Sequence, residues 1–241
     1  MRHGPVGAIG SCRTGRQQAG NGWDMGGTGS RRAVRWRVQA GAVLVAAGGL
    51  LAGCAATPPQ HPNNICDIFQ EKRSWYHTAM RQEAKWHIPA SVPMAIMNQE
   101  SSFRANARTR RTYILWIIPW GHISTAYGYA QAKNEIWRDY QRQTGAGGSR
   151  TDYADALNFM NWYITNSRKV DGIPVTDATR QYLAYHEGWT GYRRRTYASK
   201  GWLVTVARKV GHRARQYQQQ YDACRDRLKG GWWENFWDWL F

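Results

Sequence analysis

A short apolar segment that ends in an acid is the strongest candidate for chemistry in this sequence. Residues 91–97 are mostly apolar, and the chain continues as Asn-Gln-Glu-Ser, which places the carboxyl group of Glu100 just beyond them. Burial beside apolar side chains disfavours the ionised carboxylate, so it raises the pKa and yields a proton donor near neutral pH. The alternative is a solvated acid at a helix end, which is the more common state of a glutamate.

A second acid, Glu187, follows a histidine in the segment 184–188, Ala-Tyr-His-Glu-Gly. It is either a carboxylate that activates water or the ion-pair partner of Arg193–Arg195, and we favour the ion pair because surface acids beside arginine runs usually form one. His186-Glu187 also begins an HExxH metal motif, but Thr190 stands where the second histidine is needed. We therefore expect no catalytic metal and no other cofactor.

Three segments resemble, in this order, the lytic transglycosylase and goose-type lysozyme family. That family has a Glu-Ser at the end of a helix, then Gly-Leu-Met-Gln, then Ala-Tyr-Asn-Ala-Gly. The matching residues here are Glu100 and Ser101, then Gly128 and Gln131, then Ala184, Tyr185 and Gly188. The resemblance spans about residues 70–210 and implies a lysozyme-like, mostly α fold with a cleft that has Glu100 at its floor.

The resemblance also implies a mechanism with one carboxylate, acting on the bond between N-acetylmuramic acid and N-acetylglucosamine in peptidoglycan. Glu100 would protonate the glycosidic oxygen, and the acetamido group of the substrate would meet the positive charge. Glu100 would then take the proton of the C6 hydroxyl, which closes a 1,6-anhydro ring without water and differs from the two-carboxylate scheme of most glycosidases. Ser101 and Gln131 would orient Glu100 or the sugar, and Tyr185 would lie near Glu100 and position it or the acetamido group.

The sequence departs from the family pattern in three places. Tyr129-Ala130 replaces Leu-Met, His186-Glu187 replaces Asn-Ala, and the stretch 106–124 is long and rich in arginine and aromatic residues. We keep Gly128, Tyr129 and His186 as candidates that bind or orient the substrate. The departures leave two alternatives open, a muramidase that hydrolyses the same bond and a peptidoglycan-binding scaffold without activity.

The elements that position these residues are expected to be helices of one mostly α domain at residues 65–228. Apolar residues recur at helical spacing, and convincing strand alternation is scarce. Only residues 113–118 are β-prone, and Pro119 should end that strand. The expected helices are 65–86, 91–100 with Ser91 as N-cap, 152–167 with Asp152 near its start, 177–187 capped by Thr176, and 202–228.

The first 53 residues have the pattern of a secretory signal. A basic segment, 31–37, precedes an uncharged stretch, 38–53, that is too short and too rich in Gly and Ala for a confident membrane span. It ends in Leu-Ala-Gly before Cys54, which resembles a bacterial lipobox with Cys54 as the acylated residue; a plain signal peptide with a chance cysteine is the alternative. Met25 is a plausible start. We expect residues 54–64 to tether the domain to a membrane, and Ala55 favours the outer membrane facing the periplasm.

The charge of the chain indicates a polyanionic partner. Lys and Arg number 33 against 16 acids, and loss of residues 1–53 would still leave +11. Export argues against nucleic acid and leaves cell-wall polymers and anionic lipid. The basic runs 108–111, 193–195 and 208–215 are either solvated surface or attract the carboxylates of peptidoglycan. Four tryptophans are candidates for stacking on sugars, although most tryptophans in such a domain are core: Trp116, Trp120, Trp189 and Trp202.

Two further features concern the ends of the domain. Cys66 and Cys224 bracket it, and an oxidising compartment favours a disulfide over two free buried thiols; the bond would add about 3–5 kcal/mol in the chain-entropy model. The tail 229–241 has an aromatic helical face that is too short to span a bilayer. We expect this tail to dock on the domain or on a protein partner, or to lie at a membrane interface.

Overall fold

The computed structural model describes residues 57–109, 111–114, 118–122 and 124–229, and for the second and third of these ranges it describes the backbone alone. These residues belong to the unit Gly53–Phe241, and the unit Met1–Ala52 lies outside them. The predicted signal peptide, the lipid-bearing Cys54 and the aromatic tail beyond residue 229 also lie outside the described residues.

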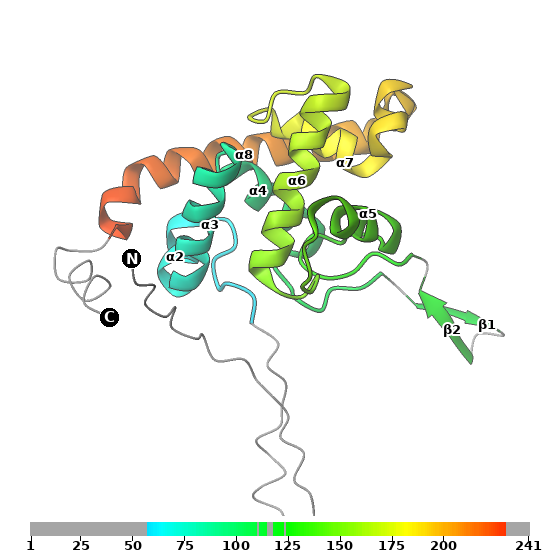
Figure 1. Cartoon of the computed structure of the whole chain (residues 1–241), viewed down its shortest axis with the longest axis horizontal. Helices are drawn as coiled ribbons and strands as arrows, with labels where there is room; N and C mark the ends of the chain where they lie inside the picture. Colours follow the sequence, from blue (N-terminus) through cyan, green and yellow to red (C-terminus); the bar gives the residue numbers. More distant parts are fainter. Residues whose placement is uncertain (1–56, 110, 115–117, 123, 230–241) are drawn as a thin grey trace, which may run out of the picture. The chain divides into compact units, whose positions relative to one another are not determined.

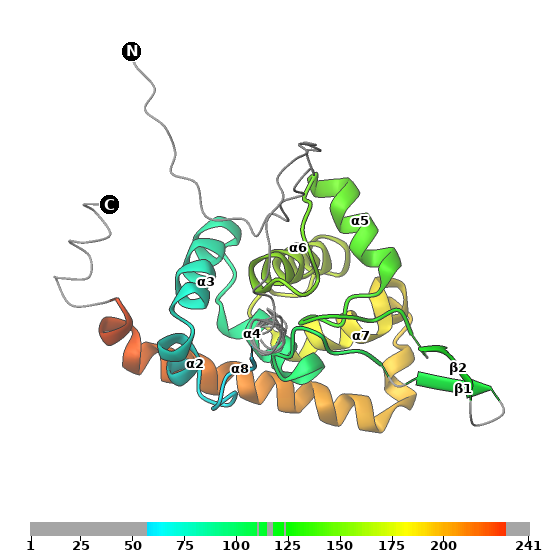
Figure 2. The same ribbon diagram turned by 90° about the horizontal axis from the view of Figure 1, so that it is seen from below.

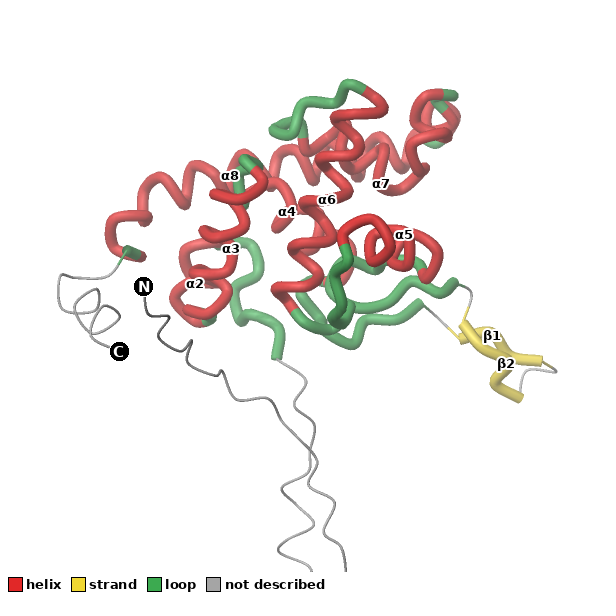
Figure 3. Tube along the Cα trace, in the orientation of Figure 1, coloured by secondary structure: helices red, strands yellow, loops and turns green. Residues whose placement is uncertain are grey.

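Helices dominate the described residues, which confirms the predicted mostly α fold (Figures 1 and 3). Most expected helices are present within a few residues of their predicted ends. The region 65–86 is two helices rather than one, because the backbone of Lys72 leaves the helical conformation. The helices are α2 (Ile65–Glu71), α3 (Arg73–Trp86), α4 (Ser91–Ser101), α5 (Asn134–Thr144), α6 (Tyr153–Asp171), α7 (Ala178–Arg193) and α8 (Gly201–Leu228), with a short 3₁₀ helix at Thr196–Ser199.

The helix starts correct two of the predicted caps. Ser91 does not cap α4; its hydroxyl bonds the side chain of Gln218 in α8 at 2.9 Å. Asp177 rather than Thr176 caps α7, because its carboxylate accepts the amide of Arg180. Asp152, which was expected near the start of α6, caps this helix, because its carboxylate accepts the amide of Asp155. Acidic caps of this kind satisfy amides that the first turn of a helix leaves free.

Helix α4 lies in the middle of the domain and contributes much of its hydrophobic core. The side chains of Met94, Ala95, Ile96 and Met97 are fully buried, and residues 91–98 all belong to the buried class. Helices α6, α7 and α8 pack against it, and Figure 2 shows α4 enclosed, with α8 running along one side. A helix that is apolar all round is stable only when it is covered on every side. Its C-terminal end is therefore the place where polar side chains reach solvent.

Helix α5 is absent from the helices expected from the sequence. Its buried positions, Trp137 and Tyr140, are three residues apart and pack on Phe159 of α6. Gly145 ends it in the left-handed conformation, which is a common helix stop. The helical pattern was present but short, because only two aromatic residues mark the buried face among the other nine residues of the helix, which are mostly charged or polar.

The β-prone region forms a hairpin rather than one strand. Strands β1 (Arg111–Ile114) and β2 (Ile118–His122) pair antiparallel, and Figures 1 and 2 show them beyond the helices. Pro119 lies inside β2 opposite Tyr113 and does not end a strand at 113–118 as expected. A two-stranded ribbon has two free edges, and an edge tolerates a proline that cannot donate to the ladder.

The predicted disulfide between Cys66 and Cys224 is present. It joins α2 to α8, with the two Cα atoms 6.2 Å apart. Both cysteines are buried, so the bond closes the domain where its first and last helices meet. None of the helices among the described residues is long and apolar enough to cross a membrane.

Candidate functional site

Glu100 lies where the buried helix α4 emerges from the core. Burial raises the pKa of its carboxyl group to about 7, and a hydrogen bond from the Tyr182 hydroxyl opposes part of that shift. Some of the residue still contacts solvent, because Glu100 lines a cavity. Ser102 and the fully buried Phe103 follow in left-handed backbone conformations and turn the chain away from the helix end. The structure thus gives Glu100 the desolvated environment of a proton donor.

The three sequence motifs meet at this helix end through hydrogen bonds to the backbone. The Ser101 hydroxyl donates to the carbonyl oxygen of Tyr129 at 2.7 Å, which joins the first motif to the second. The Tyr185 hydroxyl donates to the carbonyl oxygen of Ala130 at 2.5 Å, which joins the third motif to the second. These bonds hold the three segments in one arrangement although they are far apart in the sequence.

A cavity of about 450 Å³ opens beside Glu100. Residues of all three motifs line it, together with the start of α5 and the Tyr163 side chain of α6. The lining residues are Glu100, Thr109, Ala126, Gln131, Lys133, Ile136, Tyr163, Tyr185, His186, Glu187, Gly188 and Trp189. A mixed polar and aromatic lining of this size is typical of a small-molecule or sugar site.

Gly188 shapes the wall that α7 contributes. Its backbone, with φ 72° and ψ 161°, interrupts the helix and lets the following turn face the cavity. This conformation is open to glycine and strained for other residues. Tyr163 supports the same wall, because its hydroxyl donates to the carbonyl of Ala184 at 2.8 Å and its ring stacks on Trp189 at 4.9 Å.

Comparison with known families agrees with this geometry. The family described as the transglycosylase SLT domain matches residues 42–224, which is well over half of the chain and includes α2 to α7 and most of α8. The chain belongs to this family. No curated protein and no solved structure matches it. The match begins at residue 42, inside the predicted signal peptide.

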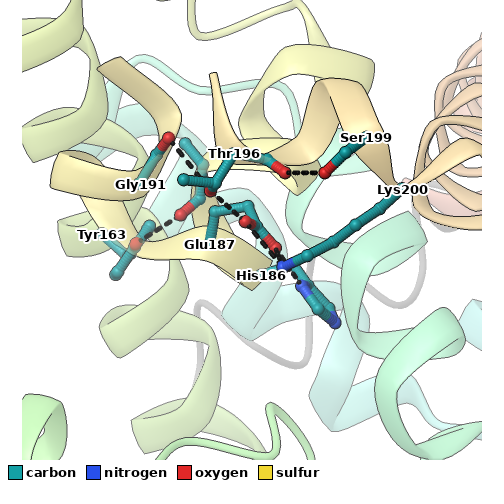
Figure 4. A network of polar contacts seen from close by, with 8 residues as sticks. Tyr163, His186, Glu187, Gly191, Thr196, Ser199 and Lys200 are labelled. Carbon is teal, nitrogen blue, oxygen red and sulfur yellow. Dashed lines mark hydrogen bonds and ion pairs between the residues drawn. The ribbon is translucent and has the colours of Figure 1, made fainter. Parts of the chain in front are cut away.

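The SLT domain of this chain holds Glu187 in a network of ionic and hydrogen bonds (Figure 4). The Lys200 ammonium lies 2.8 and 2.9 Å from its two oxygens, and the Thr196 hydroxyl and His186 Nδ1 also bond it. Burial alone would raise the pKa of Glu187, but these partners outweigh it and lower the pKa to about 2. Glu187 is therefore ion-paired as expected, but its partner is Lys200. Arg193 of the predicted arginine run pairs with Asp171 instead.

Two of the predicted substrate contacts serve the scaffold instead. The Tyr129 side chain is buried against Trp75 and Tyr153, so only its backbone reaches the site, through the bond to Ser101. Gly128 packs against the backbone of Arg150, where a Cβ atom would lie 2.0 Å from the carbonyl oxygen. Neither residue lines the cavity. Ser101 is likewise buried, and its hydroxyl is used by backbone carbonyls of Met97 and Tyr129.

Gln131 and His186 do line the cavity. The Gln131 amide nitrogen donates to the carbonyl oxygens of Ala107 and Gly128, which fixes the side chain. The His186 ring lies edge to face with Trp202, with the centroids 5.3 Å apart, and Trp202 is 59% exposed. An exposed tryptophan beside a cavity residue is better placed to stack on the face of a sugar ring than to pack in the core. Trp189 is part of the cavity wall, and Trp116 and the Trp120 side chain lie outside the described residues.

Sequence reasoning missed Tyr182 and Lys133. Tyr182 bonds Glu100 from one helical turn before Tyr185, and burial together with the charge of Glu100 raises the pKa of the tyrosine. Its three-residue spacing from Tyr185 was the available signal, because residues i and i+3 share a helix face. Lys133 lines the cavity just before α5, and no sequence signal pointed to it. Within the described residues, no group of three His, Cys, Asp or Glu side chains is placed to hold a metal ion.

Proposed function

We propose that this protein is a murein lytic transglycosylase that cleaves the β-1,4 bond between N-acetylmuramic acid and N-acetylglucosamine. The observation that carries the proposal is a carboxyl group, Glu100, whose pKa of about 7 keeps much of it protonated near neutral pH at the wall of a sugar-sized cavity. General acid catalysis works best when the pKa lies near the working pH.

In the proposed reaction, Glu100 first gives its proton to the glycosidic oxygen as the bond from that oxygen to C1 breaks. The oxygen of the substrate's acetamido group carries the positive charge that develops at C1. The ionised Glu100 then removes the proton of the C6 hydroxyl, and O6 bonds to C1 to close the 1,6-anhydro ring. Glu100 ends protonated, as it began, and no water is consumed.

The surroundings of Glu100 suit both halves of this cycle. Desolvation favours the protonated acid at the start, and the Tyr182 hydroxyl bonds the carboxylate that forms when the proton leaves. Tyr185, on the same face of α7 as Tyr182, holds that helix against the second motif, because its hydroxyl donates to the backbone of Ala130. Gln131, His186 and the exposed Trp202 are the side chains that we assign to sugar contacts.

The state of Glu187 favours the transglycosylase over the muramidase. A base that activates water must bind a proton during the reaction, and a carboxylate with a pKa of about 2 that is held by Lys200 and Thr196 is a poor acceptor. The muramidase stays the second candidate because Glu187 lines the same cavity as Glu100. No comparable observation favours the third alternative, a peptidoglycan-binding scaffold without activity.

We further propose that Cys54 carries lipid and holds the enzyme at the periplasmic face of the outer membrane. The basis is the sequence pattern around residues 31–54 together with a substrate that lies in the periplasm. The peptidoglycan glycan strand is then the main partner, and nucleic acid has no role. A protein partner bound through the tail 229–241 belongs to the same proposal.

Digestion of purified sacculi by the wild-type protein and by Glu100→Gln, with mass spectrometry of the products, tests the reaction. We expect muropeptides that are lighter by one water and lack a reducing end, and none from the variant. Reducing-end products would assign the muramidase. Bound but uncut sacculi with both proteins would assign the scaffold, and full activity of Glu100→Gln would refute the site.

A further inference from the structure

Two arginines meet in a second, smaller pocket beside the Glu100 cavity. This pocket has a volume of about 360 Å³ and contains Arg108 and Arg150. It shares Ala126 with the larger cavity, and Thr109, which follows Arg108 in the chain, also lines that cavity. One ligand molecule can therefore reach both places.

Both guanidinium groups lie over the ring of Tyr127. Their Cζ atoms are 4.1 Å (Arg108) and 5.4 Å (Arg150) from its centroid. Desolvation and then the neighbouring charge of Arg108 lower the pKa of Arg150. Among the residues that the structure describes, neither arginine has a carboxylate partner. Two like charges held close in a partly desolvated pocket repel each other, and an anion between them removes that cost.

Hydrogen bonds to the backbone hold the Arg150 side of the pocket in place. The Nη1 atom of Arg150 donates to the carbonyl oxygens of Thr125 and Ala132 at 3.0 and 2.8 Å, and the Arg150 carbonyl accepts the amide of Tyr129 at 3.1 Å. Gly128 permits this close approach of the two segments. These bonds use one of the three nitrogens of the guanidinium, which has five N–H donors in all. A fixed guanidinium loses little freedom when it binds a ligand.

We propose that Arg108 and Arg150 bind a carboxylate of the peptidoglycan strand whose glycan occupies the Glu100 cavity. A guanidinium matches the two oxygens of a carboxylate, which makes arginine the preferred residue for such a group. The carboxylate comes from the stem peptide, or from the lactyl group of a muramic acid residue that carries no peptide. The proposal rests on the proposed function and adds selectivity to it, because an uncharged glycan has no carboxylate for the two arginines to bind.

Binding to the Glu100→Gln protein tests the proposal without turnover. The ligands are glycan strands with intact stem peptides, strands stripped of peptide in which the lactyl carboxylate is free, and peptide-bearing strands whose carboxylates have been converted to amides. The test variant is Arg108→Gln, chosen because Arg108 is exposed and forms no side-chain hydrogen bond within the described residues. Arg208→Gln, on the exposed face of α8, removes the same charge elsewhere and serves as the matched control.

We expect Arg108→Gln to weaken binding of peptide-bearing strands about 3- to 10-fold, as for a solvent-accessible charged hydrogen bond, and to leave the amidated strands unaffected. The lactyl carboxyl group is amide-bonded wherever a stem peptide is attached, so a loss on peptide-bearing strands assigns a stem-peptide carboxylate. A similar loss on stripped strands would show that the freed lactyl carboxylate binds as well. Arg150→Lys keeps the charge but loses the planar guanidinium that can bind both oxygens of a carboxylate. It should also weaken binding of peptide-bearing strands and leave amidated strands unaffected.

Equal losses for Arg108→Gln and Arg208→Gln would overturn the proposal, because they would show only general electrostatic attraction. A loss that persists on amidated strands would overturn it as well. Carboxylate-dependent binding together with no cleavage of sacculi by the wild-type protein would refute the proposed enzyme and leave the pocket assignment intact.

Discussion

At the scale of single residues, the proposed chemistry depends on what surrounds two glutamates. Glu100 is desolvated at the end of a buried helix, which raises its pKa to about 7. Glu187 is surrounded by donors that lower its pKa to about 2. The two acids line one cavity, yet they are fitted for opposite tasks, proton donation and fixed negative charge.

The raised pKa of Glu100 predicts a stability that falls as the pH rises. Between the unfolded value of 4.5 and about 7 the folded state binds more protons, so deprotonation costs up to about 3 kcal/mol of folding free energy above pH 7. Glu100→Gln should therefore gain stability relative to the wild type across this window. Urea unfolding at pH 4 and pH 8 measures the change. Glu135→Gln, at an exposed acid on α5, is the control, and a difference that does not depend on pH would contradict the prediction.

The same pKa predicts how activity depends on pH. The proposed general acid is protonated below about pH 7, so kcat/KM of the wild type should decline roughly tenfold per pH unit above that value. Initial rates on sacculi fragments between pH 5 and pH 9 measure the decline. A rate that rises steadily up to pH 9 would show that no protonated carboxyl group is needed.

At the scale of elements, buried contacts hold the helices so that the motifs meet. Asn98 of α4 donates to the Tyr217 hydroxyl of α8 at 2.6 Å and to the Pro62 carbonyl, which ties the helix that carries Glu100 to both ends of the domain. Lys200, just before α8, holds Glu187 of α7. The geometry of the site therefore depends on the packing between these helices.

The ion pair between Glu187 and Lys200 separates a structural role from a catalytic one. Glu187→Gln and Lys200→Met both break the pair, and each should lower the free energy of unfolding by about 1–3 kcal/mol at pH 7. The contribution of Glu187 is present above pH 4.5 and is lost as the pH falls towards 2. If Glu187 is structural, the two variants should have similar kcat. A kcat that falls at least a hundredfold more in Glu187→Gln would assign it to water activation.

The disulfide between α2 and α8 predicts a redox-dependent stability. The bond closes a loop between residues 158 apart in the chain, and in the chain-entropy model its loss costs about 3–5 kcal/mol. The melting temperature should fall when the purified protein is reduced, and the Cys66→Ser, Cys224→Ser double variant should melt at the lowered temperature in either state. An unchanged melting temperature would show that the bond does not contribute.

At the scale of the whole molecule, the protein combines an SLT domain with a predicted export and anchoring segment. The net charge of +17, and +11 without residues 1–53, suits an anionic wall polymer. Anchoring would confine the enzyme to the surface where its substrate lies, which raises the local concentration of each for the other.

The anchor is testable without reference to activity. Expression of the full chain in a bacterial host with labelled palmitate should label the wild type, and Cys54→Ala should abolish the label and free the protein from the membrane fraction. Cys12→Ala is the control, because Cys12 precedes the basic segment and should not matter. Label that persists in Cys54→Ala would refute the lipid attachment site.

The sequence alone was enough for the helical class, for the disulfide and for Glu100 as the candidate acid. These features are local or combinatorial: helical spacing marks buried faces, and two cysteines in a domain predicted to be exported have each other as partner. The neighbours of Glu100 alone favoured a solvated acid, and the three motifs in family order made it the candidate. Helix caps did not belong to this group, because neither Ser91 nor Thr176 caps its helix as expected.

Only the tertiary structure decided which side chains face the cavity. Tyr129 was expected to contact or orient the substrate, but its side chain is buried in the core. Tyr182 was not among the predicted site residues, yet it bonds Glu100. Lys200 replaced the predicted arginines as partner of Glu187, and Arg108 and Arg150, 42 positions apart, came together over one tyrosine ring. The physical reason is that contacts between distant segments depend on how the helices pack, and spacing along one segment carries no record of that packing.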